Sequence, residues 1–283
     1  MYAGNKQEKL FQKKLERIQW GMETLHSSGD QCTIDAEIIH DIRVSFKHLK
    51  SLLLLVHCCH HSFDRHMIRQ LLPLYSIAGL IRNAQLSLAL YDQYQLNCPA
   101  FLLNQKELVL QHTTQLMSES AGYLKIIHSI ESASRHAFKD IPSRKVTACF
   151  RSKQNILHFL LALPEDIDLW HEARKIIKQL LFSYRYLPVA LKKQLHLPQE
   201  NYHILEQEIG DLHDLVFFRQ QFHGQCPMEN SMPSKDLENA EGLLKKSIAH
   251  HLQNLRQLNA SKDSGILIPS FVISCRADFG HVL

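Results

Sequence analysis

Two widely separated stretches of the chain begin with the same pattern of side chains. HDIRVSFKHLK runs from His40 to Lys50, and HEARKIIKQLL runs from His171 to Leu181. A single offset of 131 residues also matches Arg43 with Arg174, Lys47 with Lys178, Leu49 with Leu180, and Gly79 with Gly210. One offset that holds across two successive segments indicates the duplication of a structural unit.

The duplicated unit is predicted to be helical, because apolar residues recur at helical spacing along most of the chain. Glycine and proline are scarce, at 10 and 9 of 283 residues, which disfavours a turn-rich β protein. We therefore expect an all-α fold. The predicted helices cover about residues 5–27, 35–61, 64–95 with a bend at Pro73, 104–138, 144–163, 166–194, 198–223 and 235–260.

The duplication also predicts how the chain divides. Two halves are expected at about residues 5–138 and 139–262, together forming one unit over residues 5–262. The last segment, residues 263–283, follows a Ser-Gly break and contains ILIPSFVIS, so it is predicted to be an extended tail. Packing of this apolar tail on its own domain is favoured over a role in binding a protein partner.

The basic residues of each repeated helix are predicted to share one face. On a helical wheel with His40 at zero, Arg43, Lys47 and Lys50 fall within an arc of roughly 80°. The apolar residues of the same helix fall on the opposite side. The second copy repeats this arrangement, with the basic arc formed by His171, Arg174, Lys178 and Arg185.

A charged stripe opposite an apolar one is usually the solvated face of an amphipathic helix. Solvated faces usually mix signs, however, because acid–base pairs one turn apart are mildly stabilising. Residues 171–193 contain six lysines and arginines against Glu172 alone. The net charge of the chain is only +4, so such local clustering is what could attract an anion. Because the basic cluster occurs in both repeats, we expect a bound polyanion to relieve the repulsion between its positive charges.

Histidine and cysteine patterns bear on metal binding and on the cell compartment. The cluster HCCHH at residues 57–61 lacks a recognisable set of metal ligands, so no metal or other cofactor is expected. The seven cysteines show no Cys-x-x-Cys pair and are predicted to be reduced thiols. The chain begins without an apolar signal peptide, and its longest apolar run, LLLLV, is too short to cross a membrane. A cytoplasmic protein is expected.

HDIRVSFKHLKSLL and HEARKIIKQLLFSYRY resemble the two signature helices of the CHAD domain, the conserved-histidine α-helical domain. AGLIRNAQLSL and IGDLHDLVFF are similar to its second-helix motif, although the family's Arg-Asp pair appears here as Arg82-Asn83 and His213-Asp214. The second copy also has Leu181 where the family usually has a basic residue. Arg185, on the same arc, is the candidate substitute.

The resemblance covers roughly residues 5–260 and implies both a fold and a ligand. It implies two pseudo-symmetric four-helix bundles around a basic groove or pore. It also implies non-catalytic binding of inorganic polyphosphate, often at polyphosphate granules. The residues expected to bind polyphosphate are His40, Arg43, Lys47, Lys50, Arg82, His171, Arg174, Lys175, Lys178 and Arg185.

Two other functions remain open from the residues alone. A nucleic-acid or other polyanion binder could use the same basic faces, but these faces lack interleaved aromatic residues for stacking bases. An enzyme that transfers or hydrolyses phosphate would be expected to carry a Gly-rich phosphate loop or clustered acids for magnesium, and neither motif is present. We therefore expect a protein that is not an enzyme.

Overall fold

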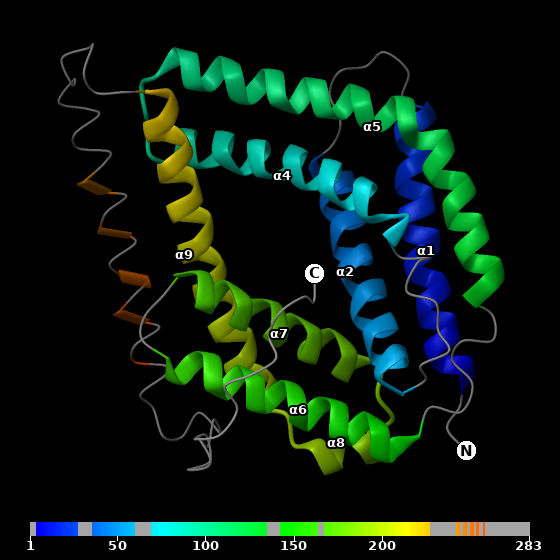
Figure 1. The fold of residues 1–283 in the computed structure, drawn as a ribbon. Coiled ribbons are helices and arrows are strands. Elements are labelled where there is room, and N and C mark those ends of the chain that lie inside the picture. Colours follow the sequence, from blue (N-terminus) through cyan, green and yellow to red (C-terminus); the bar gives the residue numbers. More distant parts are fainter. Residues whose placement is uncertain are drawn as a thin grey trace.

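The structure is a computed structural model of the chain. It describes residues 4–27, 36–59, 69–134, 142–163 and 167–226, together with scattered helical positions between residues 242 and 257. Within these residues the chain is all-helical apart from short connections (Figure 1). The helices are α1 (Gly4–Ser27), α2 (Ala36–Cys59), α4 (Leu72–Gln93), α5 (Pro99–Ser134), α6 (Ser143–Ala162), α7 (Ile167–Arg185), α8 (Val189–Leu195) and α9 (Gln199–Gln225).

In the N-terminal half, residues 4–134, the described helices α1, α2, α4 and α5 form a bundle. α1 packs against α2 and α5, and α4 packs against α2 and α5, so each helix has two neighbours in the bundle. The apolar positions that recur at helical spacing meet in one core, in which Phe11, Ile18 and Phe46 are almost fully buried. Burial of these side chains is the main stabilisation of the half, at about 25 cal/mol per Å² of apolar surface.

The C-terminal half, residues 142–226, is built from α6, α7, α9 and the short α8. α7 packs between α6 and α9, and α8 contacts α6. Their apolar faces form a second core around Phe150, Ile177 and Tyr202. In both halves the helix that carries the repeated basic pattern therefore buries its apolar face, as the helical wheel predicts.

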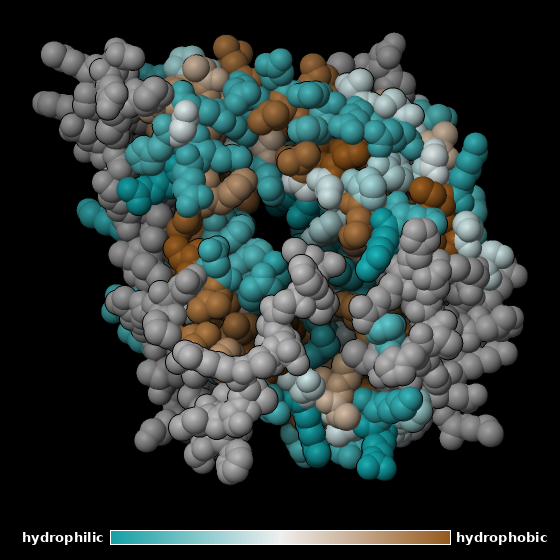
Figure 2. Space-filling view, viewed as in Figure 1, coloured by the Kyte–Doolittle hydropathy of each residue, from teal (hydrophilic) through white to brown (hydrophobic). Residues whose placement is uncertain are grey.

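Among the described helices, the two halves pack together at opposite corners of the molecule. α2 packs against α6 and α7, whereas α4 and α5 meet α9 at the other corner. A third apolar cluster, including Phe101, Phe218 and Phe222, fills that second corner. As a result α2, α4, α9 and α7 follow one another around the centre of the molecule (Figure 1). Seen from the same side, the surface is hollowed at this centre, and much of the rim is hydrophilic (Figure 2).

Helix boundaries differ from prediction where proline is present. Pro73 lies in the first turn of α4, where its missing N–H needs no partner, so the predicted bend is wrong and the residue marks a helix start. α5 begins at Pro99, five residues earlier than predicted. The single helix predicted over 166–194 is also wrong. α7 ends at Arg185, and Pro188 precedes a separate helix α8, because proline disrupts a helix interior.

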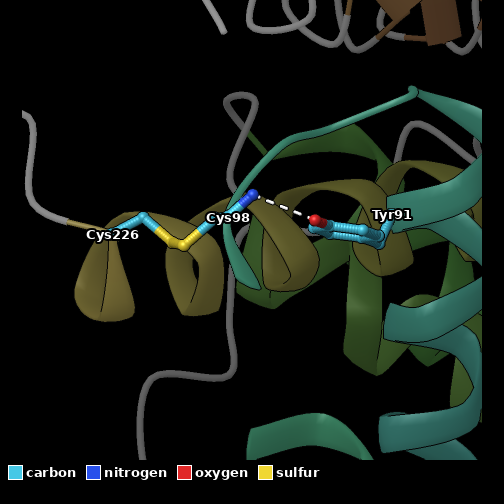
Figure 3. The surroundings of a disulfide bond; sticks show 3 residues. All are labelled: Tyr91, Cys98 and Cys226. Atoms are coloured by element: carbon cyan, nitrogen blue, oxygen red, sulfur yellow. Dashed lines mark hydrogen bonds between the residues drawn. A yellow bond between two sulfur atoms is a disulfide. The ribbon is translucent and has the colours of Figure 1, made fainter. Parts of the chain in front are cut away.

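Two cysteines form a covalent link between the halves. Cys98, in the turn between α4 and α5, is joined by a disulfide to Cys226 at the end of α9 (Figure 3). The Tyr91 hydroxyl accepts a hydrogen bond from the backbone N–H of Cys98 at 2.9 Å and so holds this turn. The prediction that all seven cysteines are reduced is wrong for this pair. Their separation of 128 residues along the chain hid their proximity.

Two other predictions concern the membrane and the C-terminal region. None of the helices in the described ranges is long and apolar enough to cross a membrane. The helix predicted over 235–260 is described only at scattered helical positions between 242 and 257. The tail predicted over 263–283 lies outside the described residues.

Candidate anion-binding site

The site is organised by the contact between α2 and α7. The Ser183 hydroxyl donates a hydrogen bond to the carbonyl of Ser51 at 3.2 Å. The ring of His48 lies against Phe182, with centroids 4.1 Å apart, and its Nδ1 is 2.8 Å from the hydroxyl of Tyr186. These buried contacts hold the two helices together where both carry their basic residues.

Lys47 of α2 lies in the middle of a group of cations. Burial, and after it the charges of Lys178, Arg43 and Arg174, lower its pKa to about 7, against the opposing effect of Glu206. Charges act on one another strongly only over short distances, and three of the four that act on Lys47 come from α7 and α9. The basic rows of the two repeated helices therefore meet in space.

Arg43 reaches from α2 across to α4. Its guanidinium lies over the ring of Tyr75, with Cζ 5.0 Å from the centroid, a favourable cation–π geometry. A Cβ at Gly79 would collide with the end of the same side chain, so glycine there leaves room for the arginine. Burial lowers the pKa of Arg43. The nearby charge of Arg82 lowers it further, while Tyr75 and Asp214 oppose this.

Arg174 of α7 is placed in a similar way against α9, but with a different partner. A Cβ at Gly210 would lie 2.7 Å from Cζ of Arg174, so the guanidinium uses the space that glycine leaves. Arg174 Nε donates to Glu206 Oε1 at 2.9 Å, and Lys178 Nζ is 2.7 Å from the same oxygen. All three side chains are about one-fifth exposed. One carboxylate thus serves two cations.

Beside this group, His171 stacks on His213, with ring centroids 4.3 Å apart. Burial, and after it the neighbouring groups His213, Lys175 and Arg174, lower the pKa of His171 to about 4. His213 Nδ1 lies 3.3 Å from Asp214. Within the described residues, Nδ1 of His171 is buried without a hydrogen-bond partner.

Not every predicted residue joins the group. Arg43, Lys47, Arg82, His171, Arg174 and Lys178 are brought together by the contacts above. His40 and Lys50 are exposed, and Lys175 is exposed and paired with Glu172 at 2.6 Å. An 80° arc on a helix is wide enough that one edge faces the neighbouring helix while the other faces water.

Arg185 acts on residues at a different place, near the contact between α1 and α2. Burial lowers the pKa of Lys14 and of His48, and the charge of Arg185 contributes to both shifts. Lys14 lines a separate cavity of about 440 Å³ between α1 and α2, together with Lys13, Arg17 and Trp20. Arg17 is paired with Asp41 across this cavity. Arg185 therefore extends the positive charge toward α1 and does not reach the group around Lys47.

Sequence reasoning missed Glu206 and Tyr75, which contact the two arginines most directly. Both precede the motif glycines by four residues, and they are related by the same offset of 131. Extending the repeat one helical turn upstream of Gly79 and Gly210 would have found them. Metal binding has no candidate in the described residues, where no three His, Cys, Asp or Glu side chains are grouped to hold an ion.

Comparison with known proteins decides the family. Residues 24–223 match the family model of the CHAD domain. The chain belongs to the CHAD domain family. The crystal structure of the CHAD domain from the plant Ricinus communis has a TM-score of 0.64 and 16% identity, covering 92% of this chain and 91% of that chain.

PptA from Streptomyces chartreusis is a second solved structure with a similar fold. It has a TM-score of 0.59 and 12% identity, and covers 92% of this chain and 98% of that chain. No curated protein matches the chain. At these identities the two structures establish the fold alone, and the predicted all-α CHAD architecture is confirmed.

Proposed function

We propose that this CHAD domain binds inorganic polyphosphate, without catalysis, at the group of cations between α2 and α7. The observation that carries the proposal is the convergence of Arg43, Lys47, Arg174 and Lys178 from two helices onto one place. Glu206 is the carboxylate that contacts this group most closely. Membership of the family supports the same ligand.

The chemistry of the side chains suits a linear polymer of phosphate. Arginine can donate two hydrogen bonds to one phosphoryl group, whereas lysine acts as a mobile point charge. His171 adds a ring nitrogen that can donate when protonated, and a bound anion favours the protonated form. Polyphosphate presents no sequence to read, so charge and spacing are sufficient for recognition.

The electrostatics of the ligand-free site support the proposal further. Burial, and after it the nearby like charges, lower the pKa of Lys47 and Lys178, so the charged forms are destabilised without a ligand. A bound polyanion would raise the pKa of both lysines and so favour their charged forms. Binding energy and relief of repulsion would then act in the same direction.

Calorimetric titration with long-chain polyphosphate at near-physiological salt tests the proposal. Wild-type protein should bind, and affinity should fall steeply as salt rises, because counterions are released from the polyanion. Joint replacement of Arg43, Lys47, Arg174 and Lys178 by glutamine should abolish binding while circular dichroism stays helical.

A matched control removes the same number of charges elsewhere. Arg69, Arg144, Lys106 and Lys125 are exposed and lie outside the group. Their joint replacement by glutamine should weaken binding only a little. Absence of binding by the wild type would reject the proposal, and so would equal losses in the two quadruple variants.

The alternative ligand is a nucleic acid or another polyanion. A competition experiment with labelled polyphosphate separates the two. If the site is specific for polyphosphate, excess unlabelled polyphosphate should displace the label, whereas excess DNA or RNA should not. Release of orthophosphate from polyphosphate during incubation would contradict the non-catalytic part of the proposal. Co-localisation of the tagged protein with polyphosphate granules in the cytoplasm tests the expected location.

A further inference from the structure

Glu206 occupies the position in the C-terminal half where an anionic ligand would be expected. Its Oε1 receives Arg174 Nε at 2.9 Å and lies 2.7 Å from Lys178 Nζ. Burial alone would raise the pKa of this carboxyl, but Lys178 and Arg174 hold it below the ordinary value. The group is therefore an ionised carboxylate that neutralises two of the cations assigned to polyphosphate.

The N-terminal half has no carboxylate at the corresponding place. One turn before Gly79 on α4 stands Tyr75, whose ring faces the guanidinium of Arg43 and stacks on Phe46 with centroids 4.7 Å apart. A cation–π contact leaves the edge of the guanidinium and its N–H groups able to donate to a phosphoryl oxygen. Arg43 thus faces a ring, whereas Arg174 donates its Nε–H to an ionised carboxylate.

We propose that Glu206 is an internal counter-ion that a polyanion must displace from Arg174 and Lys178, so that the two halves of the site bind phosphoryl groups unequally. This inference rests on the proposed function. The part formed by Arg43, Lys47 and Arg82 accepts a phosphoryl group directly. The part formed by Arg174 and Lys178 accepts one only after Glu206 moves away.

The arrangement has a consequence for the choice of ligand. Orthophosphate makes too few contacts to replace two ionic hydrogen bonds, so it binds weakly and only in the N-terminal part. A long polyphosphate chain anchored at Arg43 brings its next phosphates to Arg174 at high local concentration, which favours displacement of the carboxylate. Glu206 therefore makes the site discriminate in favour of long chains.

The test is a titration of Glu206→Gln beside wild type, with long-chain polyphosphate and with orthophosphate. The amide keeps the size of the side chain and removes its charge. Glu206→Gln should bind polyphosphate at least tenfold more tightly and should show measurable orthophosphate binding. Glu200→Gln, an exposed change in the first turn of the same helix, should stay within about twofold of wild type.

A second pair of variants guards against misfolding of Glu206→Gln. Tyr75→Glu places a carboxylate beside Arg43 and should weaken polyphosphate binding at least tenfold relative to Tyr75→Gln, which loses the ring without gaining charge. Wild-type binding with no gain in Glu206→Gln, or a loss, overturns the inference and leaves the proposed function standing. If neither wild type nor Glu206→Gln binds polyphosphate, the proposed function itself fails.

Discussion

The two halves of the molecule place an arginine in the same way and neutralise it differently. Arg43 and Arg174 each extend from a basic helix into the space left by a glycine on a neighbouring helix, Gly79 or Gly210. Arg43 then lies over an aromatic ring, while Arg174 is held by a carboxylate. In this fold, the packing of the arginine against glycine is therefore separable from the partner that faces its charge.

The difference extends to the next turn of each helix. Arg82 in the N-terminal half corresponds by the offset of 131 to His213, which stacks on His171. The N-terminal half thus adds a permanent positive charge near Arg43. The C-terminal half adds two imidazoles, of which His171 has its pKa lowered to about 4. We expect the N-terminal half to provide most of the affinity for an anion at neutral pH.

The largest expected effect concerns the bond that joins the halves. Cys98 and Cys226 close a long loop, and such a cross-link stabilises a protein by about 4 kcal/mol through the entropy of the unfolded chain. Replacing both cysteines by serine should lower the free energy of unfolding by that order, measured by urea denaturation. Replacing Cys149, which is not in a disulfide, is the control. Equal stability of the double variant and wild type would show that the bond does not form in solution.

Single arginine replacements measure the asymmetry directly. Arg43→Ala should reduce polyphosphate affinity by about 1.5–3 kcal/mol, the range for hydrogen bonds to charged groups. Arg174→Ala should reduce it less, because Arg174 is already paired with Glu206. Calorimetric titration of both variants checks the order, and a larger loss for Arg174→Ala would reverse the comparison.

The protonation of Lys47 predicts how binding depends on pH. Its folded pKa of about 7 lies below the ordinary 10.5, so the folded state holds fewer protons than the unfolded state between these values. Stability should therefore rise with pH across that window. The charged groups that act on this lysine are Lys178, Arg43, Arg174 and Glu206.

A bound polyanion favours the charged lysine, so affinity should fall as pH rises above 7, by up to about 1.4 kcal/mol per pH unit. His171, with a pKa of about 4, stays neutral over this range. Lys47→Arg keeps its charge and should flatten the dependence. Titrations in buffers of different ionisation enthalpy should detect proton uptake by wild type, and a dependence that survives in Lys47→Arg would assign it to another group.

The smallest expected effect is on stability, and it distinguishes the contact of Gly79 with Arg43 from that of Gly210 with Arg174. Replacing glycine by alanine inside a helix stabilises it by up to about 1 kcal/mol where space allows. Gly122→Ala on α5 meets nothing within 4 Å and should show the full gain. Gly79→Ala displaces only the end of Arg43, whereas Gly210→Ala also crowds Cζ and Nε of Arg174. In thermal denaturation the melting temperature should be highest for Gly122→Ala, lower for Gly79→Ala and lowest for Gly210→Ala. Any other order contradicts the two contacts.

Much of the fold was predictable because it depends on local periodicity. The helix predicted over 35–61 is α2, Ala36–Cys59, and the apolar faces of both repeated helices are buried as expected. The break before α8 was also readable in principle, since Pro188 stands inside the region predicted as one helix. Cysteine pairing was not readable, because it depends on a corner where α4, α5 and α9 meet.

The candidate site was predictable only in part, for a similar reason. The repeat identified Arg43, Lys47, Arg174 and Lys178, which the structure brings together. A helical wheel shows which face a residue shares, but not where the neighbouring helix ends. For this reason the wheel did not reveal that Lys50 is exposed, or that Arg185 acts on Lys14 and His48 in another region. Glu206 stood outside the basic pattern, although its contacts decide the charge balance of the site.

A crystal structure with bound tripolyphosphate tests the central claim most directly. Phosphoryl groups should lie between α2 and α7, with contacts to Arg43 and Lys47, and with Glu206 moved away from Arg174. Phosphoryl groups found only in the cavity between α1 and α2, around Lys14, with Glu206 still bound to Arg174, would contradict it.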